Sequence, residues 1–170
     1  MKWMTSAALA LALTTTGVQA AEVEVNRVFD ASIKKVWKKF GKFCAIQRWQ
    51  SLVDTCDVYE NKRGIHRAIV MDDGGVFVER LLEYSDLNHS FTYNILSGPV
   101  PVTNYLSTLK FEDIGNRQTL FTWTATFDVD YEIEQDVVDN LYTLFENGVD
   151  GMEDIINKTN NRQPTPYYNR

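Results

Sequence analysis

The segment EQDVVDNLYTLFENGVDGMEDIINK, residues 134–158, predicts the longest helix of this 170-residue chain. Apolar and small residues recur in it at intervals of three and four, which is the spacing of one face of an α-helix. That face consists of Val137, Leu141, Leu144, Phe145, Gly148, Met152, Ile155 and Ile156. Glu134 and Asp136 lie at the positive end of the helix dipole and Lys158 near its negative end, which is stabilising. A helix with one apolar face needs a second apolar surface to cover, so we expect a sheet beneath it.

The segments before this helix alternate apolar and polar residues, as β-strands with one buried face do. They are residues 22–30, 53–61, 64–72, 76–84, 89–98, 104–115 and 117–130. The sequence Asp72-Asp73-Gly74-Gly75 predicts a hairpin. Because the strands follow one another with short links, we expect an antiparallel meander of about six or seven strands. The predicted fold class is α+β, with a curved antiparallel sheet wrapped around the long C-terminal helix.

Two short helices are expected after the first strand. In the first of them, Ser32 is a favourable N-cap and Gly41 a helix stop. Its apolar face consists of Ile33, Val36, Trp37 and Phe40, and its opposite face of Lys34, Lys35, Lys38 and Lys39. The second covers residues 44–49. The lysine face is either simply solvated or a docking surface for an acidic partner.

The first twenty residues are organised like a cleaved bacterial export signal. Lys2 supplies the positive charge, residues 7–13 the apolar run, and Val18-Gln19-Ala20 the small residues near a cleavage site. The alternative is a membrane anchor, but a span requires about 20 apolar residues. We therefore expect a signal peptide over residues 1–20, cleaved near Ala20, one domain over residues 21–160, a loose tail over residues 161–170, and a periplasmic location.

The chain has two cysteines, Cys44 and Cys56. In an oxidising compartment an even pair of cysteines usually forms a disulfide, which here would join the second short helix to the next strand. Free thiols and a Cys/Cys/His metal site are the alternatives, but neither His66 nor His89 stands at a ligand spacing. We expect no metal site and no cofactor. The net charge of −6 at pH 7 argues against a nucleic-acid partner.

Four stretches, in this order along the chain, resemble a known family. They are FCAIQRW (residues 43–49), VERLLEYSD (78–86), YNILSGPVPVTNY (93–105) and TWTATF (122–127). The chain resembles the START/Bet v 1-like (SRPBCC) helix-grip superfamily from about residue 28 to residue 156. More narrowly, it is similar to its exported polyketide cyclase/dehydrase and lipid transport members, near the MxaD-like accessory proteins of periplasmic methanol oxidation. The resemblance implies a central hydrophobic pocket but no fixed chemistry.

By similarity to the hormone receptors of that superfamily, a set of residues would face the pocket. They are Arg67, Ile69, Met71, Glu79, Tyr93, Ile95, Tyr105, Ser107 and Ala125, and Trp123 shares strand parity with Ala125. Two departures limit the comparison. The hairpin loop at residues 72–75 is shorter than the gate loop of the receptors, and Trp49-Gln50-Ser51 stands where exported relatives often carry Trp-His-Pro.

The residues themselves allow two registers for the hairpin at residues 72–75. A two-residue turn at Asp73-Gly74 would place Arg67 opposite Arg80, with Glu79 facing away. A three-residue loop with Gly74 in the left-handed conformation would instead pair Met71 with Gly75 and Arg67 with Glu79. A slip of one residue moves every side chain to the other face. The resemblance favours the second register, in which a buried arginine and glutamate must pair.

Three hypotheses for function follow. The first is a periplasmic protein that binds a small hydrophobic or amphipathic ligand with one polar or anionic end. The second is an accessory protein that brings a periplasmic redox enzyme to its electron acceptor, with the lysine face as docking surface. The third is a cyclase or dehydratase for a polyketide-like substrate, with Glu79, Tyr105 or Arg67 as acid or base. The sequence contains no diagnostic nucleophile–base constellation, so no catalytic residue is assigned, and no stable membrane insertion is expected.

Overall fold

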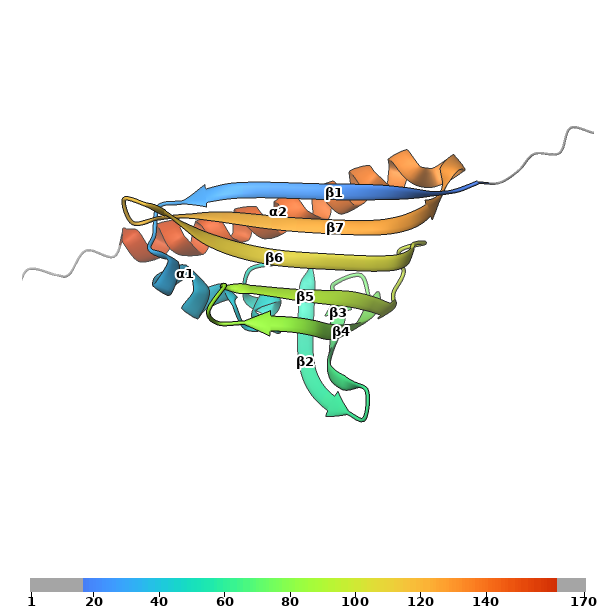
Figure 1. Ribbon diagram of the computed structural model, residues 1–170, viewed down its shortest axis with the longest axis horizontal. Coiled ribbons are helices and arrows are strands. Elements are labelled where there is room, and N and C mark those ends of the chain that lie inside the picture. The colour runs from blue at the N-terminus through green and yellow to red at the C-terminus, as the bar shows by residue number, and fades with distance from the viewer. Residues whose placement is uncertain (1–16, 162–170) are drawn as a thin grey trace, which may run out of the picture.

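The sheet and the long helix have the predicted α+β arrangement in the computed structural model, which describes residues 17–161. The strands are β1 (Val18–Phe29), β2 (Val53–Asn61), β3 (Gly64–Met71), β4 (Val76–Ser85), β5 (Ser90–Ser97), β6 (Thr103–Gly115) and β7 (Gln118–Asp130). They form one antiparallel sheet in the order β1-β7-β6-β5-β4-β3-β2 (Figure 1). Strands β2 to β7 form a meander, and β1 pairs with β7 at the edge of the sheet.

The helices follow the sequence pattern closely. They are α1 (Ile33–Phe40), the 3-10 helices η1 (Ala45–Arg48) and η2 (Tyr131–Ile133), and α2 (Glu134–Asn160). Ser32 is the N-cap of α1 by position, but its side chain makes no capping hydrogen bond. Gly41 ends α1 without a left-handed conformation, because its φ is −72°. A Cβ at Gly41 would lie 2.4 Å from the ring of Trp37, so packing requires this glycine.

The core lies between the concave face of the sheet and α2, which runs behind β1 and β7 in the view of Figure 1. The predicted stripe of α2 is buried at its centre, where Phe145 stacks on Trp123 with ring centroids 3.8 Å apart. Val149, which the stripe omitted, is fully buried, whereas Leu144 and Ile155 are only partly buried. The buried face of α2 is therefore shifted slightly from the one read from the sequence.

Two glycines of α2 allow the helix to pack closely against Trp49, at the end of η1. A Cβ at Gly151 would lie 1.8 Å from the backbone oxygen of Trp49, and one at Gly148 would lie 2.6 Å from the Trp49 ring. Trp49 therefore fills the position beneath these two glycines.

The Cys44–Cys56 disulfide fixes η1 to β2, as predicted. The two Cα atoms are 5.6 Å apart, which is a normal separation for a disulfide. The alternatives of free thiols and a cysteine-ligated metal site are therefore wrong. The bond closes a short loop that contains Trp49 and Gln50, and so it holds the segment that packs under α2.

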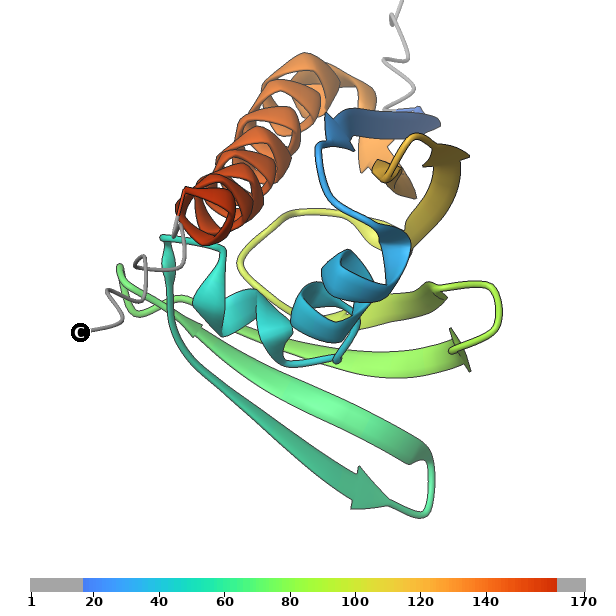
Figure 2. The same ribbon diagram turned by 90° about the vertical axis from the view of Figure 1, so that its left-hand side faces the viewer.

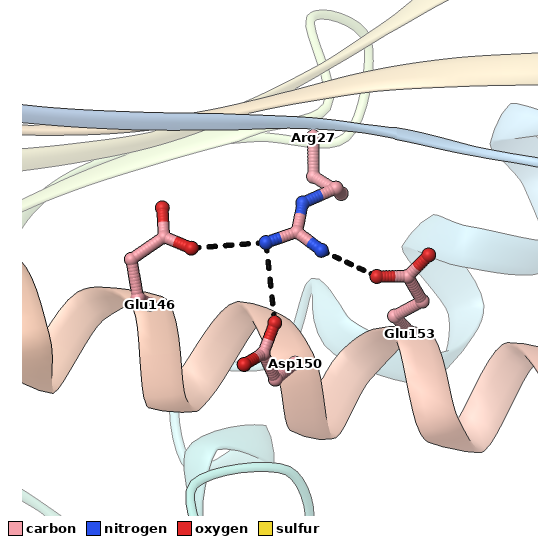
Figure 3. Close-up of polar contacts among 4 residues, drawn as sticks. All are labelled: Arg27, Glu146, Asp150 and Glu153. Atoms are coloured by element: carbon pink, nitrogen blue, oxygen red, sulfur yellow. Dashed lines mark hydrogen bonds and ion pairs between the residues drawn. The ribbon is translucent and has the colours of Figure 1, made fainter.

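A cluster of charges fastens the outer flank of α2 to β1 (Figure 3). The guanidinium of Arg27 on β1 binds Glu146 at 2.9 Å, Asp150 at 3.1 Å and also Glu153. The three acids recur at intervals of four and three residues, which places them on one side of the helix. Burial lowers the pKa of Arg27, but the hydrogen bonds and charges of the three carboxylates raise it, and the pKa is raised overall. Because these groups are partly exposed, we regard the cluster as an orienting contact.

Two boundaries of the predicted domain lie near the ends of the described region. Residues 1–16 of the predicted signal peptide and residues 162–170 of the predicted tail lie outside the described residues. β1 begins at Val18, so the predicted cleavage near Ala20 falls inside this strand. Of the residues in β1, cleavage there would remove the exposed Val18, Gln19 and Ala20 and leave the buried Val23, Val25 and Phe29 in place. In the described part of the chain, no helix is long and apolar enough to cross a membrane.

Candidate functional site

The β3–β4 hairpin adopts the register that places Arg67 opposite Glu79. Its loop is the three-residue type: the Met71 N–H donates to the Gly75 oxygen at 2.8 Å, and Gly74 has a φ of +87°. A left-handed residue at this point is inexpensive only for glycine. Gly74 therefore sets the register, and the register turns both charged side chains toward the inside of the sheet.

Arg67 and Glu79 form a buried ion pair. The Arg67 Nε donates to Glu79 Oε2 at 2.5 Å, and the two side chains are only 2% and 6% exposed. Arg67 also donates to the backbone oxygen of Phe43, and its guanidinium carbon lies 4.2 Å and 4.8 Å from the ring centres of Phe43 and Tyr93. Phe43 directly precedes Cys44 of the disulfide. The disulfide therefore also holds the backbone oxygen and the ring that contact Arg67.

Burial changes the acid–base properties of the groups around this pair. Burial raises the pKa of Glu79, and the charge and hydrogen bond of Arg67 offset part of the rise. Burial, together with the charge of Glu79, raises the pKa of Tyr93 to about 12. Burial, then Tyr93 and Glu79, also raises the pKa of Tyr105. Both phenols therefore stay protonated at neutral pH and keep a hydrogen to donate.

A small cavity of about 40 Å³ lies next to Glu79. Its lining includes seven of the ten predicted pocket residues: Ile69, Met71, Glu79, Tyr93, Ile95, Tyr105 and Trp123. A volume of this size has room for only a few water molecules. The central hydrophobic pocket implied by the resemblance is therefore small in this structure, because aromatic rings and the η1 segment occupy most of the interior.

The other three predicted residues lie behind the lining. Arg67 is covered by the rings of Phe43 and Tyr93. Ser107 is buried, where it accepts a hydrogen bond from Trp123 Nε1 at 2.9 Å and donates one to the Thr124 oxygen at 2.7 Å. Ala125 is fully buried on β7. These residues support the lining, and Glu79 is the charged residue of the pair that reaches the cavity.

Half of the lining was missed as a pocket from the sequence. It consists of Ile46, Gln50, Val53, Phe77, Leu141, Leu144 and Phe145. The apolar stripe of α2 already contained Leu141, Leu144 and Phe145, and Phe77 shares strand parity with Glu79, so these four carried a signal. Ile46, Gln50 and Val53 line the cavity because of where η1 lies, and the spacing of apolar residues in the sequence does not predict that position.

Gln50 provides a polar group where exported relatives often carry histidine. It is 2% exposed, and its Nε2 donates to the Leu144 oxygen of α2 at 2.8 Å. Through this hydrogen bond, Gln50 joins η1 to α2. Gln50 thereby positions Leu144 at the edge of the cavity.

A larger open groove of about 430 Å³ adjoins the small cavity. Met71, Phe77, Leu141 and Leu144 line both spaces and form a partition between them. Gly98 allows Phe77 to occupy its place, because a Cβ at Gly98 would lie 2.5 Å from the Phe77 ring. The remaining groove residues are Leu52, just before β2, and residues of the β3–β4 loop, the β5–β6 loop and α2. Apolar side chains thus separate a buried carboxyl group from a groove open to solvent.

The comparisons with known proteins agree with this fold. Residues 20–155 match the family model described as polyketide cyclase/dehydrase and lipid transport. No curated protein matches the sequence. Among solved structures, the protein XoxI from Bacillus cereus is 22% identical with a TM-score of 0.76, covering 84% of this chain and 99% of that one. A norcoclaurine synthase mutant from Thalictrum flavum, in complex with a transition-state analogue, is 11% identical with a TM-score of 0.65, covering 85% and 98%. At these identities the likeness shows the fold.

Proposed function

This chain belongs to the polyketide cyclase/dehydrase and lipid transport family, and we propose that it binds a small, mostly apolar molecule in an enlarged form of the inner cavity. The observation that carries the proposal is the partition described above. Met71, Phe77, Leu141 and Leu144 stand between the cavity beside Glu79 and the open groove. Displacing these apolar side chains breaks no hydrogen bond, and a mostly apolar ligand would replace the packing contacts that they lose.

The two volumes set the size of the required movement. Sites for small molecules usually measure about 300–1,000 Å³. The inner cavity of about 40 Å³ is far below that range, whereas the groove of about 430 Å³ lies within it. Met71 is unbranched and adapts its shape easily, and Leu144 is only partly buried. The ligand enters from the groove as these side chains move, and its polar end reaches Glu79.

The groups in the lining favour a hydroxyl or amine at the polar end of the ligand. Glu79 reaches the cavity while Arg67 stays behind aromatic rings. A carboxylate ligand would therefore face Glu79 without reaching the guanidinium. A hydroxyl group can donate to Glu79 and accept from Tyr93 or Tyr105, whose phenols are protonated. The proposed ligand thus keeps the polar end expected from the sequence but not the anionic alternative.

Hexanol, hexylamine and hexanoate form a matched set of probes for this site. We expect hexanol and hexylamine to raise the melting temperature of the protein, by about 5–10 °C at roughly a hundredfold excess over Kd. Hexanoate should have little effect. The variant Leu144→Trp, which fills the partition, should lose the response, whereas Tyr142→Trp on the exposed side of α2 should keep it.

A preference for hexanoate over hexanol would contradict the proposed polar contact. An unchanged response to all three probes in Leu144→Trp would contradict the location. Circular dichroism of both tryptophan variants controls for folding, so that loss of binding is separated from loss of structure.

We also propose that the protein works in the periplasm, which the Cys44–Cys56 disulfide supports. In protein isolated from the periplasm, the N-terminal residue should be Ala21. The intact mass should be lower by two hydrogens than after reduction. Two thiols that react with an alkylating reagent in the native protein would contradict this assignment.

A further inference from the structure

A second groove lies on the other side of the segment that closes the inner cavity. Ile46 and Gln50 face the cavity, whereas Ala45, Gln47 and Arg48 line this second groove, which measures about 780 Å³. We infer that it is a docking site for an acidic segment of a partner protein that inserts an apolar side chain. The site is separate from the small-molecule site proposed above.

The floor of the groove is apolar although it faces solvent. Val58 of β2, Ile65 of β3 and Tyr84 of β4 are 52%, 39% and 43% exposed, and the partly buried Leu81 lies with them. Figure 2 shows the β2–β3 hairpin extending away from the rest of the sheet. Its outer end carries Val58 and Ile65 beyond the cover of α2. Burying such side chains under a partner would contribute about 25 cal/mol per Å² of apolar surface.

The rim of the groove is basic although the chain carries a net charge of −6. Lys42 and Arg48 line it, and the exposed Lys34 and Lys38 continue the row at intervals of four residues. We call Lys34, Lys38, Lys42 and Arg48 the basic ridge. Within residues 17–161 none of the four forms a salt bridge.

The ridge differs from the lysine face expected from the sequence. Lys35 is occupied, because its Nζ donates to Asn160 Oδ1 at 2.8 Å at the end of α2. Lys39 is partly buried. Arg48 of the ridge is held at the rim, because its Nη2 donates to the Lys39 backbone oxygen at 2.7 Å. The cations available to a partner therefore follow the groove rather than the whole outer face of α1.

The shape and charge of the groove favour a polypeptide as its occupant. A small-molecule site buries about 70–90% of its ligand, whereas this groove is open along its length. A flat membrane surface does not reach the floor of a groove. A polypeptide can place one apolar side chain on the floor and acidic residues along the ridge, which combines a buried anchor with complementary charge.

The test uses a fluorescein-labelled peptide with a central Phe-Leu pair flanked by aspartate and glutamate. We expect binding that weakens as salt is raised from about 0.01 M to 0.15 M. The double variant Lys42→Glu/Arg48→Glu should weaken binding about 10-fold or more, which corresponds to about 1.4 kcal/mol. Ile65→Ser should weaken it as well, and so should replacing Phe-Leu in the peptide by two alanines. Lys110→Glu on β6, outside the groove, is the matched control and should change little.

Three results would overturn the inference. They are no binding of the peptide to the wild-type protein, equal loss in Lys110→Glu and the ridge variant, and ridge-dependent binding of phosphatidylglycerol vesicles in place of the peptide. The ridge residues are exposed, so the double variant should fold normally. Its response to hexanol should be that of the wild type, which distinguishes this site from the inner cavity.

Discussion

Replacing Gly151 by alanine is expected to destabilise the protein by about 2 kcal/mol or more. The new Cβ would lie 1.8 Å from the backbone oxygen of Trp49, and a backbone atom cannot rotate away as a side chain can. Overpacking usually costs about 1–3 kcal/mol and occasionally more. Alanine in place of glycine inside a helix contributes about 1 kcal/mol in the opposite direction. We expect the collision to dominate, as a lower free energy of unfolding in urea.

The sign of the change makes this prediction decisive. Gly148→Ala should be less harmful, because its Cβ would meet the side chains of Trp49 and Gln50, which can shift. Asn157→Ala, at an exposed position of the same helix, should be neutral or slightly stabilising. If Gly151→Ala stabilised the protein as Asn157→Ala does, α2 would not pack on η1 at this distance.

Replacing either Arg67 or Glu79 is expected to lower the free energy of unfolding. The loss should be larger when Glu79 is replaced and Arg67 remains. Breaking a buried ion pair by removing one partner typically costs about 3–5 kcal/mol. In Glu79→Leu, Arg67 remains buried and charged, since a guanidinium does not lose its proton in proteins. In Arg67→Met, Glu79 can become neutral by taking up a proton. We therefore expect the larger loss of unfolding free energy in Glu79→Leu.

The double variant Arg67→Met/Glu79→Leu distinguishes two contributions to the free energy of unfolding: the loss of the ion pair itself and the burial of a charge without a partner. It should be more stable than Glu79→Leu, because it leaves no buried charge without a partner. A loss in Glu79→Leu within about 0.5 kcal/mol, as at surface sites, would contradict the burial of the pair.

The pH dependence of Arg67→Met has a definite sign. Burial raises the pKa of Glu79 in the folded state above the ordinary value of 4.5. Below that value the carboxyl group is protonated in both states, and stability is lost as the pH rises through the folded pKa. Removing Arg67 removes the offset, so the decline should extend to higher pH. Unfolding in urea from about pH 4.5 to pH 8 should therefore show a larger loss for Arg67→Met at the higher pH. The decline should be absent in Glu79→Leu.

The strands, the helices and the family could be predicted from the sequence because their signals are local. The period of two in residues 104–115 and 117–130 reappears in the burial of β6 and β7, and the stripe of residues 134–158 in that of α2. The pair of cysteines, together with the predicted export signal, was enough to predict the disulfide. The hairpin register could not be decided from the residues themselves, because both turns suit the sequence Asp-Asp-Gly-Gly.

Other features depended on contacts between segments far apart in the chain. Trp49 occupies the space under Gly148 and Gly151, which are about a hundred residues away, and this contact reduces the expected pocket to a small cavity. The rings of Phe43 and Tyr93 withdraw Arg67 from that cavity and leave Glu79 as its charged residue. The apolar faces of the strands and of α2 follow from the order of the residues alone. The space that remains between these faces depends on side chains packed from both directions, and those side chains meet only in the folded chain.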